Sequence, residues 1–296
     1  MNAKKLGNKL GAWAFVRLQK WMERKSPLQA EISGAKLGRF AFKLSKRHRA
    51  RALENLTRAF PEMAASERLK VAQGVLEHFG RVMADFLRSN VRSNEEALAS
   101  TEVVGREHFD EALKLGRGIL LVSGHFGNWE RMSHWISASG YPVSVVARDA
   151  NDPEMNKLVV ELRNACGAKV ISRGDAVRPI LERLRGNELV GILPDQNSGE
   201  IFVPFFGHLC GTVKGPGTLA LRTKSPVIPV YCVRVGPARY QMVICPPLEP
   251  EPGFEPIEGM TRAINRSLEE QIRRYPEQYL WIHNRWKSAK AQGLIT

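Results

Sequence analysis

Signatures of several common enzyme classes are missing from this sequence. It contains no G-x-S-x-G elbow, which argues against a serine hydrolase triad. It contains neither a G-x-x-x-x-G-K-[ST] loop nor an H-E-x-x-H pair, so nucleotide hydrolysis and zincin chemistry are not supported. Internal repeats and low-complexity tracts are also absent. What is present is material for a large core, because 43% of the 296 residues are hydrophobic.

Cysteine is scarce, and the N-terminal part has no long apolar run. The four cysteines show no C-x-x-C spacing and follow no secretory leader, which favours buried thiols in a reducing compartment over disulfides or zinc. Between Lys9 and Arg17 the uncharged run has only seven residues. A bilayer-spanning helix needs about 20 predominantly apolar residues, so a single span stays possible but is not demanded here. The cysteines are Cys166, Cys210, Cys232 and Cys245.

Positive charge is concentrated at the N-terminus. Fourteen of the 44 Lys and Arg residues, but only two of the 30 Asp and Glu residues, lie in residues 1–51. This segment therefore carries +12 of the formal charge of +14, and the rest of the chain is nearly neutral. Such a basic segment is compatible with nucleic acid, an acidic protein or an anionic membrane surface as its partner.

Apolar residues inside the basic segment favour the membrane among these partners. They recur at helical spacing and include two tryptophans, and residues 34–44 repeat the same mixture. We expect residues 1–50 to be a basic amphipathic segment lying in the interface of an anionic membrane, where each charge contributes about 1 kcal/mol. Nucleic acid is not an expected partner. The alternative is a surface helix packed on the body of the protein. The first apolar set is Leu6, Leu10, Trp13, Ala14, Phe15, Val16, Leu18, Trp21 and Met22.

The next part of the chain is predicted to be helical. Residues 47–60 and 66–89 follow the 3.6-residue period, and the second helix contains the tripeptide His78-Phe79-Gly80, which we interpret as packing. A polar stretch at 89–100 marks the expected boundary. We therefore expect a membrane-associating segment at 1–50, a helical region packed on the core at 51–100, and an α/β domain at 101–296.

From about residue 102, strands and helices alternate. Strands are predicted at 118–123, 142–148, 168–172 and 188–195, with helices at 129–138, from Asp152 to near Gly167, and from Asp175 to Arg185. Short links between them predict a mixed, mostly parallel, open α/β sheet flanked by helices. The later runs at 201–206, 226–235 and 239–248 are expected to extend it, the last two as an antiparallel pair around Gly236-Pro237.

Two polar residues directly follow predicted strands. His125 comes after the strand at 118–123, and Asp195 ends the one at 188–195. In an open α/β sheet, ligands bind beyond the carboxyl ends of the strands, so the two residues are expected to share a crevice.

His125 and Glu130 form a candidate catalytic pair within LVSGHFGNWE. A histidine oriented by a carboxylate is a good general base for a hydroxyl group. Residues five apart on a regular helix point in different directions, so a direct pair requires a non-helical turn, for which Gly124 and Gly127 give the freedom. The alternative is an ordinary strand-to-helix turn, with Glu130 placed favourably in the first turn of a helix.

Other candidates carry less weight. GPGTLA, starting at Gly215, imitates a dinucleotide-binding signature, but no strand leads into it, so we interpret its small residues as allowing close helix packing. Arg163 lies on a predicted helix, where it is compatible with a solvated charge. Arg173 follows a strand and is better placed to meet an anion.

His125-Phe-Gly-Asn-Trp-Glu130 resembles the H-x4-D/E block of the glycerolipid and lysophospholipid acyltransferase superfamily. Its form is that of the lauroyl and myristoyl acyltransferases of lipid A. Further blocks in the order of that family cover nearly the whole chain. They are ENLTRAFPE (54–62), the pair Arg163 and Arg173, ELVGILPDQ (188–196), IFVPFFG (201–207), GPGTLALRT (215–223), PVIPVY (226–231) and YPEQYLWIHNRWK (275–287).

The resemblance implies a role for each matching residue. His125 would remove the proton of an acceptor hydroxyl, and Glu130 would orient it. The substrate-binding candidates are Arg163, Arg173, Asp195, Asn128 and Gly127, with backbone N–H groups near Gly127 as candidate oxyanion donors. The donor would be acyl-acyl carrier protein and the acceptor a phosphorylated, Kdo-bearing lipid A precursor (Kdo-lipid IVA type), with no metal or cofactor. The expected location is the cytoplasmic face of a bacterial inner membrane.

Alternatives stay open at this point. Where glycerol-phosphate acyltransferases have an F-x-E-G-T-R block, this sequence has LPDQNSGE, which disfavours glycerol phosphate. The same fold acting on another glycolipid, such as a phosphatidylinositol mannoside, or on a lysophospholipid is one alternative. A non-catalytic basic protein that binds membrane or nucleic acid is the other.

Overall fold

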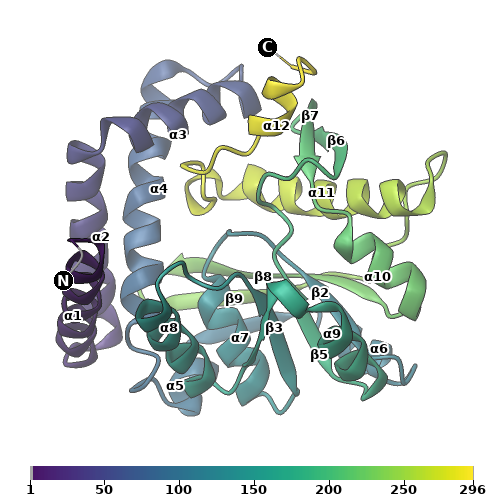
Figure 1. The fold of residues 1–296 in the computed structure, drawn as a ribbon, viewed down its shortest axis with the longest axis horizontal. Helices are drawn as coiled ribbons and strands as arrows, with labels where there is room; N and C mark the ends of the chain where they lie inside the picture. The colour runs from purple at the N-terminus through teal and green to yellow at the C-terminus, as the bar shows by residue number, and fades with distance from the viewer. Residues whose placement is uncertain (1–2, 296) are drawn as a thin grey trace.

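The protein is an α/β fold in which helices flank a mixed, mostly parallel open sheet (Figure 1). The computed structural model describes residues 3–295. Met1 and Asn2 of the predicted membrane segment and Thr296 of the predicted catalytic domain lie outside the described residues, as do the side chains of residues 3–6. The fold class expected from the strand–helix alternation is confirmed.

The main sheet has seven strands in the order β1-β9-β8-β2-β5-β3-β4. The five strands from β8 to β4 run parallel to one another, and β9 pairs antiparallel with β8 across the predicted turn at Pro237. The edge strand β1 pairs parallel with β9 and was not predicted. The bounds are β1 Thr101–Val104, β2 Ile119–Val122, β3 Val143–Ala147, β4 Lys169–Ser172, β5 Leu189–Ile192, β8 Val227–Gly236 and β9 Arg239–Ile244.

Helices cover both faces of this sheet. Alternate side chains of β2 show the division, since Ile119 and Leu121 pack toward α6 and α7, whereas Leu120 and Val122 pack toward α9, α10 and α11. All four are buried, as expected for a central parallel strand. The helices are α5 Asn94–Ala99, α6 Glu107–Leu113, α7 Trp129–Ala138, α8 Pro153–Ala165, α9 Val177–Arg185, α10 Gly215–Thr223, α11 Pro256–Arg274 and α12 Lys287–Ala291, with the 3-10 turns η1 Arg173–Asp175 and η2 Pro276–Gln278.

Three boundaries differ from the sequence-based prediction. The run at 201–206 does not join the main sheet but pairs with the next segment as a separate hairpin, β6 Ile201–Phe205 and β7 His208–Thr212. Phe206 and Gly207 both have positive φ and make the two-residue turn that favours this local pairing. The predicted boundary at 89–100 contains the short helix α5. Asp175 lies in the 3-10 turn η1, not at the start of α9.

The N-terminal helices lie together beside the α/β layer (Figure 1). They are α1 Ala3–Glu23, α2 Pro27–Leu44, α3 Lys46–Ala59 and α4 Ala65–Phe86. Helices α2 and α4 cross so closely that a Cβ at Gly34 would lie 2.2 Å from the carbonyl oxygen of Gly80. Among residues 3–295, no helix is both long and apolar enough to span a bilayer.

A buried carboxylate also fixes α2 to the sheet. Glu31 is 3% exposed and binds the Arg234 guanidinium through both oxygens, at 2.9 and 3.0 Å. The same carboxylate accepts hydrogen bonds from the Tyr240 hydroxyl and the Ala238 backbone N–H. Removing one partner of a buried ion pair leaves an uncompensated charge, so the second half of the basic segment is built into the fold.

Candidate active site

The register of the neighbouring parallel strands β2 and β5 places His125 and Asp195 at the same level of the sheet. Val122 at the end of β2 pairs with Ile192 at the end of β5, and His125 and Asp195 each lie three residues further along. The His125 backbone N–H donates to Asp195 Oδ2, and Nδ1 of its ring lies 2.8 Å from Asp195 Oδ1. The prediction that these two residues meet beyond the strand ends is confirmed.

The contact with Asp195 determines the electrostatics of the histidine. Burial alone favours the neutral ring, but the charge and hydrogen bond of Asp195, with a smaller contribution from Glu130, raise the pKa of His125 above its usual value. Burial of Asp195 acts to raise its own pKa, yet His125 holds that pKa below the usual range. The Asp195 carboxylate thus keeps the proton on Nδ1, which leaves Nε2 as the basic nitrogen of the neutral ring.

Glu130 lies in the first turn of α7 and binds a different partner. Arg163 of α8 donates two hydrogen bonds to the Glu130 carboxylate, from Nη2 to Oε1 at 2.7 Å and from Nε to Oε2 at 3.1 Å. Trp129 also donates to Glu130 from its indole N–H, and its ring packs edge-on against His125 at 5.2 Å. Burial opposes the charge of Arg163, but Glu130 raises the pKa of the guanidinium.

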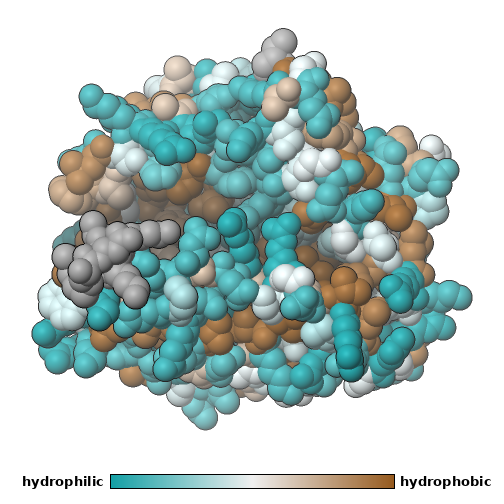
Figure 2. All heavy atoms as spheres, in the orientation of Figure 1, coloured by the Kyte–Doolittle hydropathy of each residue, from teal (hydrophilic) through white to brown (hydrophobic). Residues whose placement is uncertain are grey.

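The sequence predicted a direct bond between Glu130 and His125. Among the described residues, the structure instead forms two separate pairs. His125 binds Asp195, and Glu130 binds Arg163. The physical reason is the helix itself, because α7 starts at Trp129 and directs Glu130 toward α8, while His125 stays in the turn at the level of β5. Figure 2 shows the surface hollowed beside α4 and above α8, the helix that carries Arg163.

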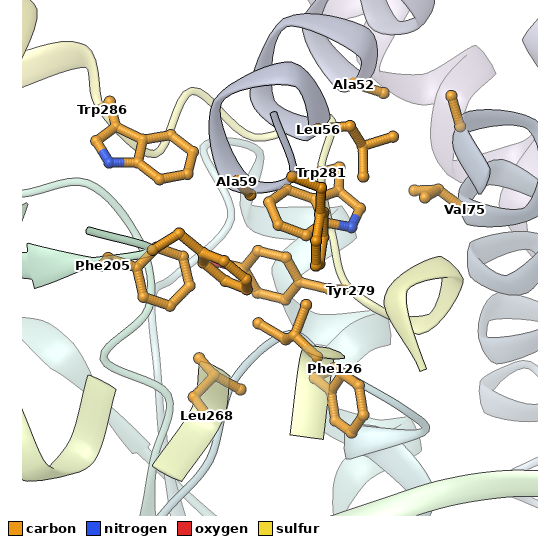
Figure 3. Close-up of a cluster of buried hydrophobic side chains, with 14 of the residues drawn as sticks. Ala52, Leu56, Ala59, Val75, Phe126, Phe205, Leu268, Tyr279, Trp281 and Trp286 are labelled. Carbon is orange, nitrogen blue, oxygen red and sulfur yellow. The ribbon is translucent and has the colours of Figure 1, made fainter. Parts of the chain in front are cut away.

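The C-terminal segment holds the histidine turn from the other side. Leu280 donates its backbone N–H to the His125 carbonyl, and Gly127 donates to the Gln278 carbonyl. Phe126, between the two bonded residues, is fully buried with Tyr279 in the aromatic cluster of Figure 3. The YPEQYLWIHNRWK block had no role in the residue-level prediction. Only the fold shows that it holds the turn that contains His125.

Gly127 and Asn128 form hydrogen bonds and close contacts within the protein. Gly127 has a φ of +58°, and a Cβ there would lie 2.2 Å from the Cys232 carbonyl oxygen. Asn128 caps α7 by accepting from the Arg131 N–H, and its amide donates to Asp85. Because the Gly127 N–H is already bonded, it is not free as an oxyanion donor, and Asn128 has both ends of its amide engaged. The predicted substrate contacts of Gly127 and Asn128 stay predictions, because both residues form hydrogen bonds within the protein instead.

The other HFG tripeptide lies directly against the site. His78 of α4 hydrogen-bonds through Nε2 to the Gly127 carbonyl at 3.0 Å, and the Phe79 ring stacks on Trp129. Burial lowers the pKa of His78 to about 4. The interpretation of this tripeptide as packing is confirmed, but its packing partner is the turn that contains His125, which no sequence signal indicated.

Arg173 is the candidate that the fold does not bring to the others. It lies exposed in η1, after the edge strand β4. Two strands of the order β2-β5-β3-β4 separate β4 from β2, which leads to His125. No described contact joins Arg173 to His125 or Glu130.

Two residues near His125 had no predicted role. Gln196 follows Asp195, and its amide nitrogen lies 3.4 Å from His125 Nε2. His283 accepts from the Asn197 backbone N–H at 3.0 Å, and burial lowers its pKa. Both belong to blocks quoted for the resemblance, so the blocks contained a signal without a residue-level assignment.

The arrangement is suited to proton abstraction. A half-buried imidazole has one nitrogen bonded to a carboxylate and the other at the partly exposed edge beside Gln196. Such a ring can take a proton from a hydroxyl group as that group attacks an electrophilic carbon.

Comparison with known proteins indicates acyl transfer. The family model described as bacterial lipid A biosynthesis acyltransferase matches residues 10–288. A lipid A biosynthesis acyltransferase of Haemophilus influenzae is 28% identical over 261 residues, which cover 86% of this chain and 80% of the relative. The lipid A biosynthesis lauroyltransferase of Escherichia coli K12 is 28% identical over 260 residues, covering 86% and 84%.

A relative with a different named substrate is also similar. The phosphatidylinositol mannoside acyltransferase of Mycolicibacterium smegmatis is 25% identical over 239 residues, covering 78% of this chain and 77% of the relative. The names of these relatives therefore agree on acyl transfer but differ in the acceptor.

Proposed function

The chain belongs to the bacterial lipid A biosynthesis acyltransferase family, and we propose that it transfers a fatty acyl chain from acyl-acyl carrier protein to a hydroxyl of a Kdo-lipid IVA type precursor. The observation that carries the proposal is the His125–Asp195 pair, whose second ring nitrogen faces the exposed edge of the site. His125 is the proposed general base. Asp195 orients it, and the Glu130–Arg163 pair lines the site beside it.

The proposed reaction uses His125 directly. Its Nε2 removes the hydroxyl proton while the hydroxyl oxygen attacks the thioester carbonyl carbon. The carbon–sulfur bond then breaks, and the departing thiolate of the carrier takes the proton back from the imidazolium. The Asp195 carboxylate stabilises the imidazolium that forms between these steps. This route has no covalent acyl-enzyme and gives each proton a donor and an acceptor within the site.

We also propose that α1 and α2 attach the enzyme to an anionic membrane. Nine of the twenty exposed large apolar side chains among the described residues lie on these two helices. Figure 2 shows apolar atoms exposed over α2, at the upper left of that view. Exposed basic residues flank them, among them Arg17 and Lys36. The nine are Leu10, Trp13, Leu18, Trp21, Leu28, Ile32, Leu37, Phe40 and Leu44.

This arrangement supports the interfacial proposal because each helix has two different faces. Ala12 and Met22 of α1 and Phe42 of α2 are buried against the body, while Trp13 and Phe40 are each 60% exposed. Tryptophan at headgroup level and lysine or arginine toward acidic lipids is the usual interfacial pattern. The proposed three parts are thus the membrane-associating segment 1–50, the helical region 51–100 and the catalytic domain 101–296, at the cytoplasmic face of the inner membrane.

An activity assay tests the enzymatic proposal. Purified protein is mixed with acyl carrier protein carrying labelled C12 to C16 chains and with Kdo-lipid IVA, and mass spectrometry measures the product. We expect the acceptor to gain one acyl chain. A parallel reaction offers phosphatidylinositol mannoside, because one relative has that acceptor in its name. Acylation of the mannoside alone would support this second acceptor, and acylation of neither would contradict the proposal.

Vesicle binding tests the membrane proposal separately. Trp13→Ser combined with Phe40→Ser should reduce sedimentation with phosphatidylglycerol vesicles and leave the free energy of unfolding nearly unchanged, since both side chains are exposed. The matched control is Leu69→Ser on α4, 47% exposed and outside the basic segment. Equal binding by the double variant and the wild type would remove α1 and α2 from the membrane contact.

A further inference from the structure

Gln196 lies beside the nitrogen of His125 that is left for chemistry. Its amide nitrogen is 3.4 Å from Nε2, while Nδ1 on the other side of the ring is bonded to Asp195 at 2.8 Å. An acceptor hydroxyl has to approach Nε2 to lose its proton to His125. Any oxygen in that position therefore meets the Gln196 amide as well.

The backbone on both sides of Gln196 is fixed. Asp195 accepts two hydrogen bonds from His125, one from the backbone N–H and one from the ring. Asn197 donates its N–H to His283 Nε2, and its side chain exchanges two hydrogen bonds with Ser288. Gln196 is thus held between two anchored neighbours while its own side chain is exposed. The backbone that carries the amide is therefore in place before a substrate binds.

Backbone donors of the histidine turn are engaged elsewhere. The N–H of His125 is bonded to Asp195, that of Gly127 to the Gln278 carbonyl, and that of Asn128 to the Cys232 carbonyl. These three N–H groups cannot stabilise a developing oxyanion without breaking an existing bond. A side-chain donor at the Nε2 edge can stabilise the oxyanion without breaking these three bonds, and the Gln196 amide lies at that edge.

We propose that Gln196 is a catalytic residue whose amide N–H donates to the oxyanion of acyl transfer. This inference rests on the proposed function. When the hydroxyl oxygen attacks, the proton goes to His125 Nε2 and the carbonyl π electrons move onto the thioester oxygen. That oxygen and the attacking oxygen are bonded to the same carbon, so an amide beside Nε2 reaches both. The negative charge returns to the carbonyl bond when the carbon–sulfur bond breaks.

Kinetics of Gln196→Ala in the full chain test the role. Loss of a single oxyanion donor costs about 10²–10³ in kcat in other acyl-transfer enzymes. With labelled acyl-acyl carrier protein and Kdo-lipid IVA, we expect kcat to fall by about 10², KM to stay within about threefold, and the thermal unfolding midpoint to stay unchanged because the side chain is exposed. Gln196→Glu keeps the size but removes the donor, so it should lose at least as much.

The control and the contrary outcomes are distinct. Gln292→Ala, at an exposed glutamine after α12, should keep wild-type kinetics. A kcat of Gln196→Ala within about threefold of wild type, or a loss confined to KM, would overturn the oxyanion role while leaving the proposed function intact. If the wild type itself transfers no acyl chain to Kdo-lipid IVA, the proposed function fails first, and this role fails with it.

Discussion

The chain contains the same tripeptide, His-Phe-Gly, in two places that touch each other. His78 lies in the middle of α4, is 5% exposed, and is kept neutral by burial, which lowers its pKa to about 4. His125 lies in the turn after β2, with 20% of its side chain exposed. Its pKa is raised, because the neighbouring Asp195 outweighs the effect of burial. The same two residues follow both rings, yet their pKa values are shifted in opposite directions.

The difference explains why His125, and not His78, is the proposed base. The His78 ring is 5% exposed and its Nε2 is bonded to the Gly127 carbonyl, so this ring is held in the packing between α4 and the turn after β2. His125 has a carboxylate behind it and an open nitrogen in front. The difference comes from Asp195, which lies beyond the end of the neighbouring strand β5, and not from the tripeptide itself.

The largest expected effect comes from removing the base. His125→Ala should lower kcat by at least about 100-fold, because general-base catalysis contributes about 10²–10⁴. Vesicle binding should persist, since His125 belongs to neither α1 nor α2 and is not among the exposed apolar residues on these helices. The acyl-transfer assay and vesicle sedimentation are run on the same preparation. An unchanged kcat would remove His125 from the mechanism.

The next effect separates the two carboxylates. Asp195→Asn should lower kcat by about 10–100-fold and shift the acidic limb of the pH–kcat profile to lower pH, because the group that raises the His125 pKa becomes neutral. Glu130→Gln is the comparison. It breaks the pair with Arg163 but leaves the Asp195 bond, so the limb should move less.

The full pH–kcat profile of the three proteins measures this. If Glu130→Gln moved the acidic limb more than Asp195→Asn, then Glu130 would be the orienting residue after all, and the pairing seen in the structure would not be the working one.

The other HFG histidine should affect stability more than turnover. His78→Ala removes a buried ring and leaves the Gly127 carbonyl without its partner, so the free energy of unfolding should fall by about 2 kcal/mol. The kcat of the folded protein should fall by less than about tenfold. Urea unfolding and kinetics at 25 °C measure the two quantities. A loss of kcat as large as that of His125→Ala would contradict the assignment of His78 to packing and of His125 to chemistry.

The smallest expected effect is on the pH dependence of stability, where the two histidines act in opposite directions. The folded pKa of His78, about 4, lies below its usual 6.5, so its stabilisation is complete above pH 6.5 and is lost as the pH falls through 4. His125 has a folded pKa raised above 6.5, so its stabilisation is complete below pH 6.5 and is lost as the pH rises through the folded pKa.

Urea unfolding at several pH values tests this sign. Between pH 7 and pH 5, replacing His78 by Gln should reduce the loss of stability by about 1–2 kcal/mol relative to wild type. His134, whose pKa burial also lowers to about 4, remains in the variant and keeps part of the slope. An equal slope in both proteins would mean that His78 is protonated alike in the folded and unfolded states.

The sequence was sufficient for the parts of the fold that depend on local pattern. Asp152 and Pro153 predicted the start of α8, and the structure places the Asp152 carboxylate on the Met155 N–H as its cap. The β8–β9 turn was also visible in Gly236-Pro237. The segments at 101–104 and 208–212 were missed because each forms a strand only through its partner, β9 or β6.

By itself, the sequence determined the composition of the site and its level in the sheet. His125 and Asp195 each follow a strand by a fixed number of residues, and parallel strands end at the same edge, so their meeting could be derived from spacing alone. The family could be identified from the order of its blocks.

Only the tertiary structure decided which groups bind each other. The direction of α7 brings Glu130 into contact with Arg163. Residues 278–280 pack against the turn that contains His125, and α4 places His78 in contact with Gly127. These contacts join segments 33 to more than 150 residues apart in sequence. Their geometry depends on how whole helices pack, which no local pattern of residue types specifies.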